Sequence, residues 1–460
     1  MDEVELYIEN FNQQGDGIAL YSKEGAPSSK VAVSHAIIGD LIKADLYKRK
    51  KRGFLKARLT SIVKKSKLRT EPLCSHCQIC GGCRWQEMNY SEQLKFKEKI
   101  IAKEFSAHIP KILPIIPCND PYNYRNKMEF SFSENGAKTK FLGLMIAAAN
   151  RYVFNVEKCY LASSWFSDVL NGVRAWWEKS LLGAYKAITN EGTLRSLTIR
   201  EGKNTNEKMV FLTVSGRSEF ALSKTDISSF VEAVKSSLPN TENLSIFLRI
   251  WQIAKGSPTQ FFDMHLFGPD HIKEKINIQG KELVFKISPS SFFQPNTFQA
   301  EKLYNKALEL TEVSKEDVVF DLYCGTGTLG MIFSSYVKKV VGIELNRDAI
   351  IDAEENLKLN NIENFELHQG DVGKVLTSMD KISPDLVIVD PPRSGLDHLA
   401  LSNLKILRPK NILYISCNPK TQSENIKELL KEGYILKVIQ PVDQFPHTIH
   451  IENIALLARN

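Results

Sequence analysis

The chain has 460 residues, of which 25% are charged and 43% hydrophobic. These values are typical of a globular protein with two or three domains. Its start, Met1-Asp2-Glu3, is unlike a secretory leader, and no apolar run approaches the ~20 residues that a membrane helix needs. We therefore expect a cytoplasmic protein and exclude a membrane protein.

The first 65 residues alternate apolar and polar positions in short runs, for example at 4–8 and 31–33, with glycines between them. Alternation with period two predicts β-strands, and several short strands in succession predict a small β-barrel of the oligonucleotide-binding type. We assign this unit to residues 1–65.

Positive charge is concentrated in residues 43–69, which contain 12 Lys or Arg and one acid. This stretch has a net charge of +11 against +7 for the whole chain, so the remaining residues sum to −4. A charge run is most often a solvated face. The density here favours a surface for RNA phosphates, with Tyr47 and Phe54 available for base stacking.

Half of the eight cysteines lie within ten residues, at Cys74, Cys77, Cys80 and Cys83. In an intracellular chain such a cluster indicates a metal site rather than disulfides. Ferredoxin-like runs of this kind give three ligands to an iron–sulfur cluster and take the fourth from elsewhere. A structural zinc ion bound by all four local cysteines is the alternative.

Residues 66–290 are predicted to form a central α+β domain that carries these cysteines. A helix near 90–106 is expected to pack on the following domain. Further strands are expected at 127–132, 194–200, 209–214, 245–250 and 283–287, with helices at 163–181 and 223–237.

From residue 291 to 460 the pattern becomes regular and predicts an α/β, Rossmann-like domain with a mostly parallel sheet. The expected strands are 317–323, 338–343, 385–389 and 411–415. The expected helices between them are 299–311, 347–360 and 421–431. Ligands of such sheets bind at the carboxyl ends of the strands.

A glycine run, Gly325, Gly327 and Gly330, follows the first of these strands, and Glu344 closes the next. This arrangement fits a dinucleotide or S-adenosylmethionine equally well. The run Asp390-Pro-Pro-Arg after strand 385–389 narrows the choice, because base-modifying methyltransferases often place an acidic or amide residue before two prolines there. Asp before Pro is also a common turn signal.

Cys417 follows strand 412–416 at the same edge. Carbon 5 of uracil is a poor nucleophile, but a thiolate that adds to carbon 6 turns the ring into an enolate that attacks a sulfonium methyl group. The carbon 5 proton must then pass to a base. The commonest alternative for a free cysteine is a buried apolar role.

Glu452, in the run FPHTIHIE (445–452), is the best base candidate, with His450 on the same face of an extended chain. From this segment alone, it is equally consistent that Glu452 is a strand residue that faces the solvent.

Together these residues resemble the 5-methyluridine RNA methyltransferases, in particular the iron–sulfur type that acts on 23S ribosomal RNA. The matching runs, in the family's order, are SFFQPN (291–296), DLYCGTGT, VVGIE, DPPRSGL (390–396), YISCNP (414–419) and FPHTIHIE. The first 65 residues look like the family's RNA-binding TRAM domain. The chain departs from the family at FPHT, where FPQT is more usual.

The resemblance implies S-adenosylmethionine as methyl donor, Cys417 as nucleophile, Glu452 as base and Phe292 beside the target base. It implies donor contacts at Gln294, Tyr323, Gly325, Thr328, Glu344, Asp371 and Asp390. For the metal it implies a [4Fe–4S] cluster on Cys74, Cys80, Cys83 and Cys159, which leaves Cys77 spare. It implies rRNA processing, with ribosomal RNA as the partner and tRNA as the alternative, and no obligate protein partner.

Three other functions remain open from the residues. A methyltransferase acting on an exocyclic amine would not need Cys417, and an NAD-linked oxidoreductase would use only the glycine run. A non-catalytic RNA-binding module would leave the strand-end motifs unexplained. Because base stacking blocks the ring face, we expect the target uridine to be flipped out or to lie in a loop.

Overall fold

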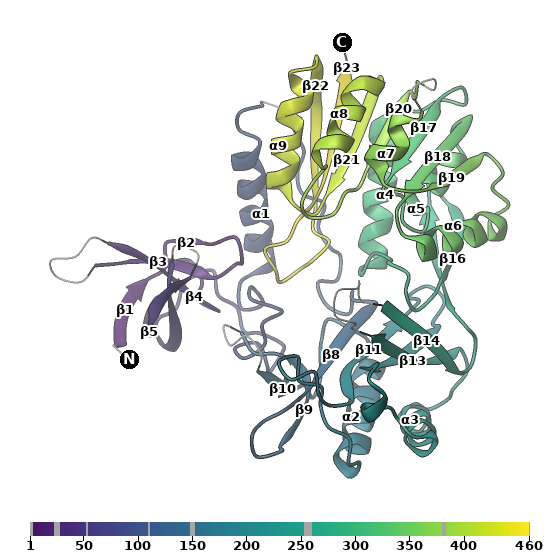
Figure 1. The fold of residues 1–460 in the computed structure, drawn as a ribbon. Helices are drawn as coiled ribbons and strands as arrows, with labels where there is room; N and C mark the ends of the chain where they lie inside the picture. Colours follow the sequence, from purple (N-terminus) through teal and green to yellow (C-terminus); the bar gives the residue numbers. More distant parts are fainter. Residues whose placement is uncertain are drawn as a thin grey trace.

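The computed structural model describes residues 3–22, 28–51, 54–108, 111–147, 152–252, 260–379 and 383–459, without the side chains of 48–51 and 54. Three units built on β-sheets follow one another along the chain (Figure 1). No helix in these ranges is long and apolar enough to cross a membrane.

The N-terminal unit is a six-stranded sheet in the order β1-β5-β6-β4-β3-β2. It has its own core, which includes Leu6, Val31, Val33 and Ile42, and it projects to the left of the other units in Figure 1. The strands are β1 (Glu3–Tyr7), β2 (Asn10–Phe11), β3 (Gly17–Tyr21), β4 (Ser29–Val33), β5 (Leu41–Lys51) and β6 (Phe54–Lys64).

Arg69, counted in the predicted basic surface, lies inside the protein. Its guanidinium forms ion pairs with Asp40 at 2.7 Å and Glu87 at 3.0 Å, and its side chain is 6% exposed. The prediction that this residue holds RNA phosphates is wrong, because two carboxylates already neutralise its charge. The stacking prediction for Phe54 and the basic side chains of 48–52 lie outside what the structure describes.

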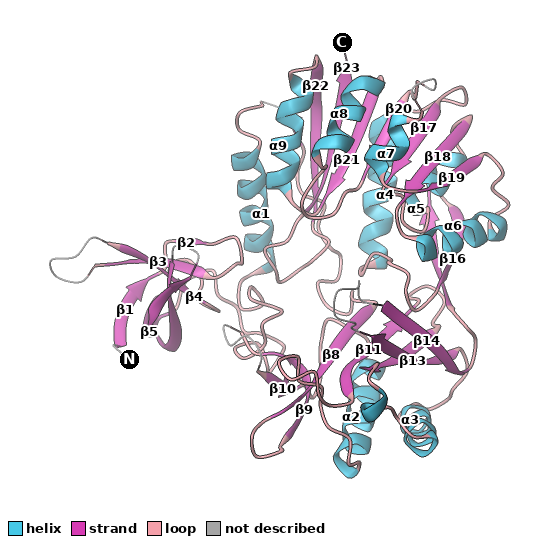
Figure 2. Cartoon of the chain, in the orientation of Figure 1, coloured by secondary structure: helices cyan, strands magenta, loops and turns pink. Residues whose placement is uncertain are grey.

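The central unit is a seven-stranded sheet with two helices on one face (Figure 2). One helix, α2, buries Trp165, Val169, Val173 and Trp177, which recur every four residues along one stripe. The order is β10 (Val153–Asn155), β9 (Lys140–Met145), β8 (Lys127–Glu134), β11 (Leu194–Glu201), β12 (Lys208–Ser215), β13 (Leu244–Gln252) and β14 (Gln260–Phe267). The helices are α2 (Ser164–Lys179) and α3 (Lys224–Ser236), with a short η1 (Ser218–Phe220).

A hairpin, β15 (Ile272–Ile278) and β16 (Lys281–Ile287), connects the central unit to the third. Its apolar residues share one core with the third unit, and the Asn356 side chain of the third unit accepts a hydrogen bond from the Lys286 amide at 2.6 Å. The hairpin is therefore fixed to the third unit on one face.

The third unit is an eight-stranded sheet with helices on both faces, as predicted for 291–460. Its order is β19 (Phe365–Gln369), β18 (Lys339–Glu344), β17 (Val318–Leu322), β20 (Leu386–Val389), β21 (Asn411–Ser416), β23 (Glu452–Arg459), β22 (Tyr434–Val442) and β7 (Lys111–Ile112). The helices are α4 (Thr297–Thr311), α5 (Thr328–Ser334), α6 (Arg347–Leu359), α7 (Val372–Thr377), α8 (His398–Leu407) and α9 (Pro419–Leu430). Apolar clusters fill both faces of the sheet.

The helix expected near 90–106 packs on the third unit, as predicted, and a short strand after it joins the same sheet. The helix α1 (Tyr90–Glu104) contributes Ile101 to the core of the third unit, and Phe105 follows in the same core. The strand β7 adds to the sheet beside β22. The packing of α1 was therefore expected from the sequence, whereas the addition of β7 to the sheet was not.

Candidate active site

Five of the predicted site residues stand at the carboxyl ends of parallel strands. Tyr323 follows β17, Asp390 follows β20 and Cys417 follows β21. Glu344 is the last residue of β18, and Asp371 caps α7 just after β19. Since β17 lies between β18 and β20, these side chains gather where the strand order reverses, which is the usual ligand site of such sheets.

The antiparallel strand β23 brings Glu452 to the same edge. Its register with β21 pairs Ser416 with Asn453, so the next residues, Cys417 and Glu452, lie across from each other. Glu452 is 4% exposed, whereas Cys417 is partly buried in the wall of a cavity. The register of two neighbouring strands thus joins the two predicted catalytic residues.

Charges of both signs act on the Cys417 thiol. Burial raises its pKa, and the carboxyl groups of Glu452 and Asp390 raise it further, whereas Arg393 lowers it. Arg393 therefore favours the thiolate, the nucleophilic form. The Arg393 carbonyl accepts a hydrogen bond from Asn418 Nδ2 at 2.9 Å, which ties the Pro-Pro turn to the turn after β21.

The carboxyl groups of Asp321, Asp390 and Glu452 lie at this edge, at least partly buried, with few groups nearby that would stabilise their negative charge. Burial raises the pKa of Asp321 and of Asp390 to about 7, and that of Glu452 well above its ordinary value. The charge of Asp390 adds to the increase at the other two. Asp321 Oδ1 is buried without a hydrogen-bond partner among the described residues. Carboxyl groups in such surroundings need a proton or a cation, so the pocket fits a positively charged ligand.

The glycine run after β17 forms a turn that needs its glycines. Gly325 and Gly327 have φ values of 55° and 80°, which favour glycine. The Gly325 amide donates a hydrogen bond to the Glu344 carboxylate at 3.1 Å, and Thr328 begins α5. Tyr323 also has a positive φ, 65°, and burial raises its pKa. The backbone is thus open to a ligand at this turn.

The segment before α4 lies next to the β22–β23 connection. Asn296 Nδ2 donates to the Gln444 carbonyl at 3.2 Å, and Gln444 Nε2 donates to the Asn296 carbonyl at 3.2 Å. The Gln294 carbonyl accepts a hydrogen bond from Asn126 Nδ2 at 2.8 Å. Phe292 is 71% exposed, which is unusual for a phenylalanine and leaves its ring free to contact a ligand.

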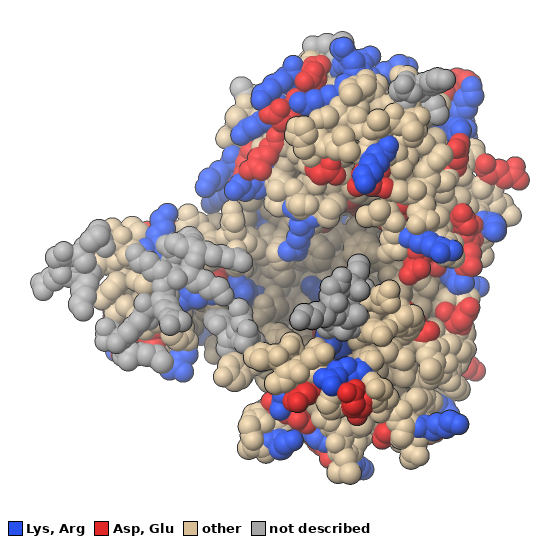
Figure 3. Space-filling model, in the orientation of Figure 1, with Lys and Arg blue, Asp and Glu red and all other residues tan. Residues whose placement is uncertain are grey.

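A cavity of about 680 Å³ opens at Cys417. It lies between the third unit, α1 and the β2–β3 region of the N-terminal unit, and its wall carries the basic residues Arg393, Lys99, Lys103 and Lys420. Burial lowers the pKa of His450, which also lines it, to about 4. Figure 3 shows that this face is deeply hollowed between the units, with Lys and Arg along the walls.

Cys159 joins the four sequence-adjacent cysteines, as predicted. Cys83 and Cys159 belong to one small apolar cluster with Tyr124, and the charged form of Cys159 raises the pKa of Cys83, while Cys80 and Cys74 raise that of Cys159. Burial is the larger cause of the raised pKa at both residues. All five thiols are free and at least partly buried, so soft metal ligands are concentrated at one place.

Cys77 has neighbours that the other cysteines lack. Its sulfur lies with ligand atoms of His35 and Glu87, all within 4.8 Å of one another, and in the described ranges no other three His, Cys, Asp or Glu side chains are so close.

The sequence analysis gave no role to two residues of this site. Arg393 lies in the DPPR run quoted above. The signal that could have identified it is a cation directly after the Pro-Pro turn. Asp321 was a lone acid inside the apolar run of β17, where a charged residue is costly unless it serves a ligand or the backbone. In the structure, Arg393 lies near Cys417 and Asp321 lies near Asp390.

The comparisons with known proteins cover the whole chain. The family described as tRNA (Uracil-5-)-methyltransferase matches residues 259–460. An "uncharacterized RNA methyltransferase" of Protochlamydia amoebophila is 46% identical over 92% of this chain and 99% of its own length. One of Clostridium tetani is 35% identical over 99% of this chain and 98% of its own. The crystal structure of Pyrococcus abyssi tRNA (uracil-54, C5)-methyltransferase with S-adenosyl-L-homocysteine matches with a TM-score of 0.75 and 25% identity, over 99% of each chain.

Proposed function

Because this chain belongs to the family of S-adenosylmethionine-dependent RNA uracil-5 methyltransferases, we propose that it methylates carbon 5 of one specific uridine in 23S ribosomal RNA. The observation that carries the proposal is the register of β21 and β23, which sets Cys417 opposite Glu452 beside Asp390. An NAD-linked oxidoreductase and a non-catalytic module do not agree with this family membership.

In the proposed reaction, Cys417 Sγ adds as a thiolate to carbon 6 of uracil, and the electron pair of the ring double bond passes to carbon 5 and the neighbouring carbonyl. Carbon 5 then takes the methyl group that S-adenosylmethionine supplies when bound. Glu452 accepts the carbon 5 proton, the double bond re-forms, and the thiolate leaves carbon 6. Arg393 stabilises the thiolate before addition and after elimination.

We assign donor binding to the residues at the sheet edge. Asp390 and Glu344, with Gln294 and Tyr323, would contact the donor, and Gly325, Thr328 and Asp371 would line its site. A sulfonium or ammonium charge there would lower the pKa of the three carboxyl groups, because opposite charges favour ionisation. Glu452 would thereby become the carboxylate that the base step requires.

The cavity at Cys417 would take the flipped uridine, with Phe292 packed on the base. Lys99, Lys103 and Lys420 would hold phosphates of the flanking strand. The N-terminal unit, as a TRAM-like domain, would extend this surface through residues 43–67. The basic residue Arg69 is left out because its charge is already paired.

We assign a [4Fe–4S] cluster to Cys74, Cys80, Cys83 and Cys159. The gathering of free, at least partly buried thiols around Cys83 supports a metal site there, and the resemblance to the iron–sulfur type favours iron over zinc. Its role would be structural, because methyl transfer needs no redox centre. An absorbance shoulder near about 400 nm, with iron on elemental analysis, tests this assignment, since thiolate-bound iron absorbs there.

The substrate is tested by mass spectrometry of ribosomal and transfer RNA from cells that lack the protein. Loss of one 5-methyluridine from 23S ribosomal RNA is expected. Loss from tRNA alone would contradict the ribosomal assignment and favour tRNA, the substrate in the name of the Pyrococcus abyssi structure. Retention of every 5-methyluridine would contradict both.

A further inference from the structure

We infer that α1 and the cysteine segment (residues 74–88) form a cradle that holds the β22–β23 connection, and through it the base Glu452, with Lys97 and Asp443 as the positioning residues at its centre. This inference rests on the proposed function, because it assumes that Glu452 removes the carbon 5 proton.

The connection in question is short and begins beside the base. In the hairpin of β22 and β23, Val442 pairs with Glu452, so residues 443–451 form the loop between them. Asp443 directly follows the strand partner of Glu452. A shift of the loop at Asp443 is therefore transmitted to Glu452 over a single cross-strand pair.

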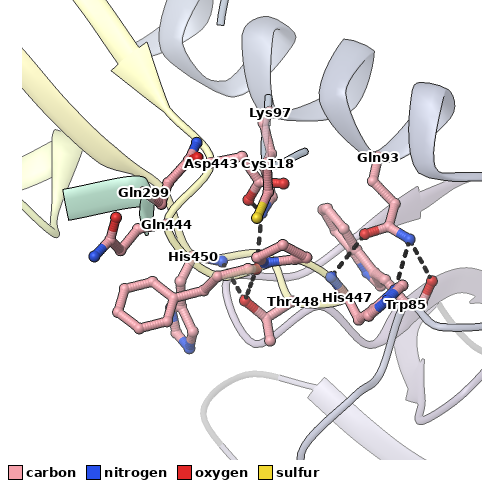
Figure 4. Close-up of polar contacts among 12 residues, drawn as sticks. Trp85, Gln93, Lys97, Cys118, Gln299, Asp443, Gln444, His447, Thr448 and His450 are labelled. Carbon is pink, nitrogen blue, oxygen red and sulfur yellow. Dashed lines mark hydrogen bonds and ion pairs between the residues drawn. The ribbon is translucent and has the colours of Figure 1, made fainter. Parts of the chain in front are cut away.

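Lys97 and Asp443 form an ion pair that is closed to solvent. Lys97 Nζ lies 2.5 Å from Asp443 Oδ1, and both side chains are 0% exposed (Figure 4). Tyr90 donates a hydrogen bond to Asp443 Oδ2 at 2.6 Å, and Lys97 donates a second one to the Phe445 carbonyl at 3.1 Å. The first turns of α1 thus hold the loop at two successive points.

The cysteine segment holds the next part of the loop. Gln93 Oε1 accepts a hydrogen bond from the His447 amide at 2.9 Å, while Gln93 Nε2 donates to the Trp85 carbonyl at 3.0 Å. The Trp85 amide donates to the His447 carbonyl at 3.0 Å. Tyr122 packs its ring on His447 with centroids 4.6 Å apart. Gln93 therefore joins α1, the cysteine segment and the loop at one residue.

A buried ion pair is poor evidence for stability, because desolvating two charges costs about as much as their attraction returns. Such a pair does fix geometry, since either charge left alone in the interior is strongly unfavourable. Here the contacts of Lys97, Asp443 and Gln93 converge on the loop that precedes Glu452, whereas Cys417 is carried by β21 and by the turn tied to Arg393. The far end of α1 meets the helix after Cys417, where Ser423 Oγ donates to the Glu104 carbonyl at 2.8 Å. Lys97, Asp443 and Gln93 therefore act on the side of the base.

This division predicts a specific defect. A displaced loop should leave the addition of Cys417 and the methyl transfer intact but slow the removal of the carbon 5 proton. The enzyme should then accumulate a covalent adduct with methylated RNA from ordinary uridine. A lesion that only destabilised the fold would reduce adduct and product together.

The test uses full-length Lys97→Met, Asp443→Asn and Gln93→Ala, with Lys95→Met as the matched control, because Lys95 lies on the same helix with a side chain 63% exposed. Single-turnover reactions with uridine-containing RNA are resolved on denaturing gels. We expect about 100-fold slower product release in Lys97→Met and Asp443→Asn, as for a misplaced catalytic group, with adduct accumulation. Gln93→Ala should show a smaller form of the same defect without leaving a buried charge.

Glu452→Gln and Cys417→Ala separate failure of this inference from failure of the proposed function. If Glu452→Gln accumulates a Cys417-dependent adduct while the folded cradle variants match Lys95→Met, the inference is overturned and the reaction stands. If no variant ever forms an adduct at Cys417, the proposed reaction itself fails. If Lys97→Met and Asp443→Asn do not fold, Gln93→Ala decides: adduct accumulation supports the cradle, and wild-type behaviour overturns it.

Discussion

Thiols lie in a partly apolar setting both at the sheet edge that carries Cys417 and where the cysteine segment meets Cys159, but the surroundings of these thiols differ. Cys417 has Arg393 on one side and an open cavity on the other. Cys83 and Cys159 lie among other thiols and aromatic rings, and Arg125 lowers the pKa of both. Burial raises the pKa at both places, so burial alone does not separate a nucleophile from a metal ligand. An arginine lies near the thiols at both places, so the difference is one of access, because Cys417 lines an open cavity.

The largest effect expected from this difference is at Cys417. Replacing Cys417 with Ala should lower methylation by roughly 10⁴-fold or more, as removal of a covalent nucleophile does. Iron content and the absorbance near about 400 nm should stay at wild-type values, because the metal site would not involve this thiol. Radiolabelled methyl transfer and iron analysis of the same preparation provide the measurement. Retained methylation would favour an enzyme that attacks an exocyclic amine.

The second prediction concerns a change in the cysteine segment, which should affect the metal and not the thiol at Cys417. Cys83→Ser should lower the bound iron by about tenfold or more, because loss of a ligand costs at least as much affinity as loss of a supporting hydrogen bond. The 5-fluorouridine adduct at Cys417 should still form in the fraction that stays folded. Iron quantification together with covalent trapping checks both statements. An unchanged iron content would remove Cys83 from the proposed ligands.

A pH profile sharpens the role of the cation. Since burial and the carboxyl groups raise the pKa of Cys417, the thiolate fraction, and with it the rate, should rise as the pH increases from neutral to alkaline. Glu452, whose pKa is also raised, contributes in the same direction because it acts deprotonated. Arg393→Ala should move the profile to higher pH and lower the rate about tenfold at neutral pH, as expected for loss of a close opposite charge. A rate ratio constant with pH would contradict this role and leave RNA binding as the function of Arg393.

The smallest effect is expected at Cys77. Cys77→Ser should keep iron and methylation within about twofold of wild type, because this thiol lies with His35 and Glu87 and outside the proposed ligand set. Iron analysis and single-turnover kinetics, run beside Cys83→Ser as the matched comparison, make the measurement. A loss of iron equal to that of Cys83→Ser would place Cys77 among the ligands.

Local signals allowed most of the third unit to be predicted. Strands such as β17 and β20 are short apolar runs because they are buried on both faces, and their ends carry the polar motifs. The motif residues Tyr323, Asp390 and Cys417 were therefore placed at the correct edge from sequence alone. The strands predicted in the central unit at 127–132, 194–200 and 209–214 were also confirmed.

Other features depend on contacts between distant parts of the chain. The position of β23 between β21 and β22 and the addition of β7 to the sheet follow from pairing, which no local pattern encodes. Lys97 and Asp443 lie 346 positions apart, and in sequence Lys97 is one of several lysines on a polar helix. Arg69 looked like part of a basic surface because its partners Asp40 and Glu87 are distant in sequence.

The place of β23 also bears on how the protein is assembled. β22 precedes β23 in the chain, yet β23 occupies the position between β21 and β22 and pairs with both. The sheet is therefore continuous only after β23 has paired with both β21 and β22. Pairing between strands that are distant in sequence is a slow step in folding. The proposed nucleophile, Cys417, and the proposed base, Glu452, meet across that same pairing. A partly folded chain in which β23 has not yet paired with β21 would therefore lack the proposed reactive pair even where its other units are already folded.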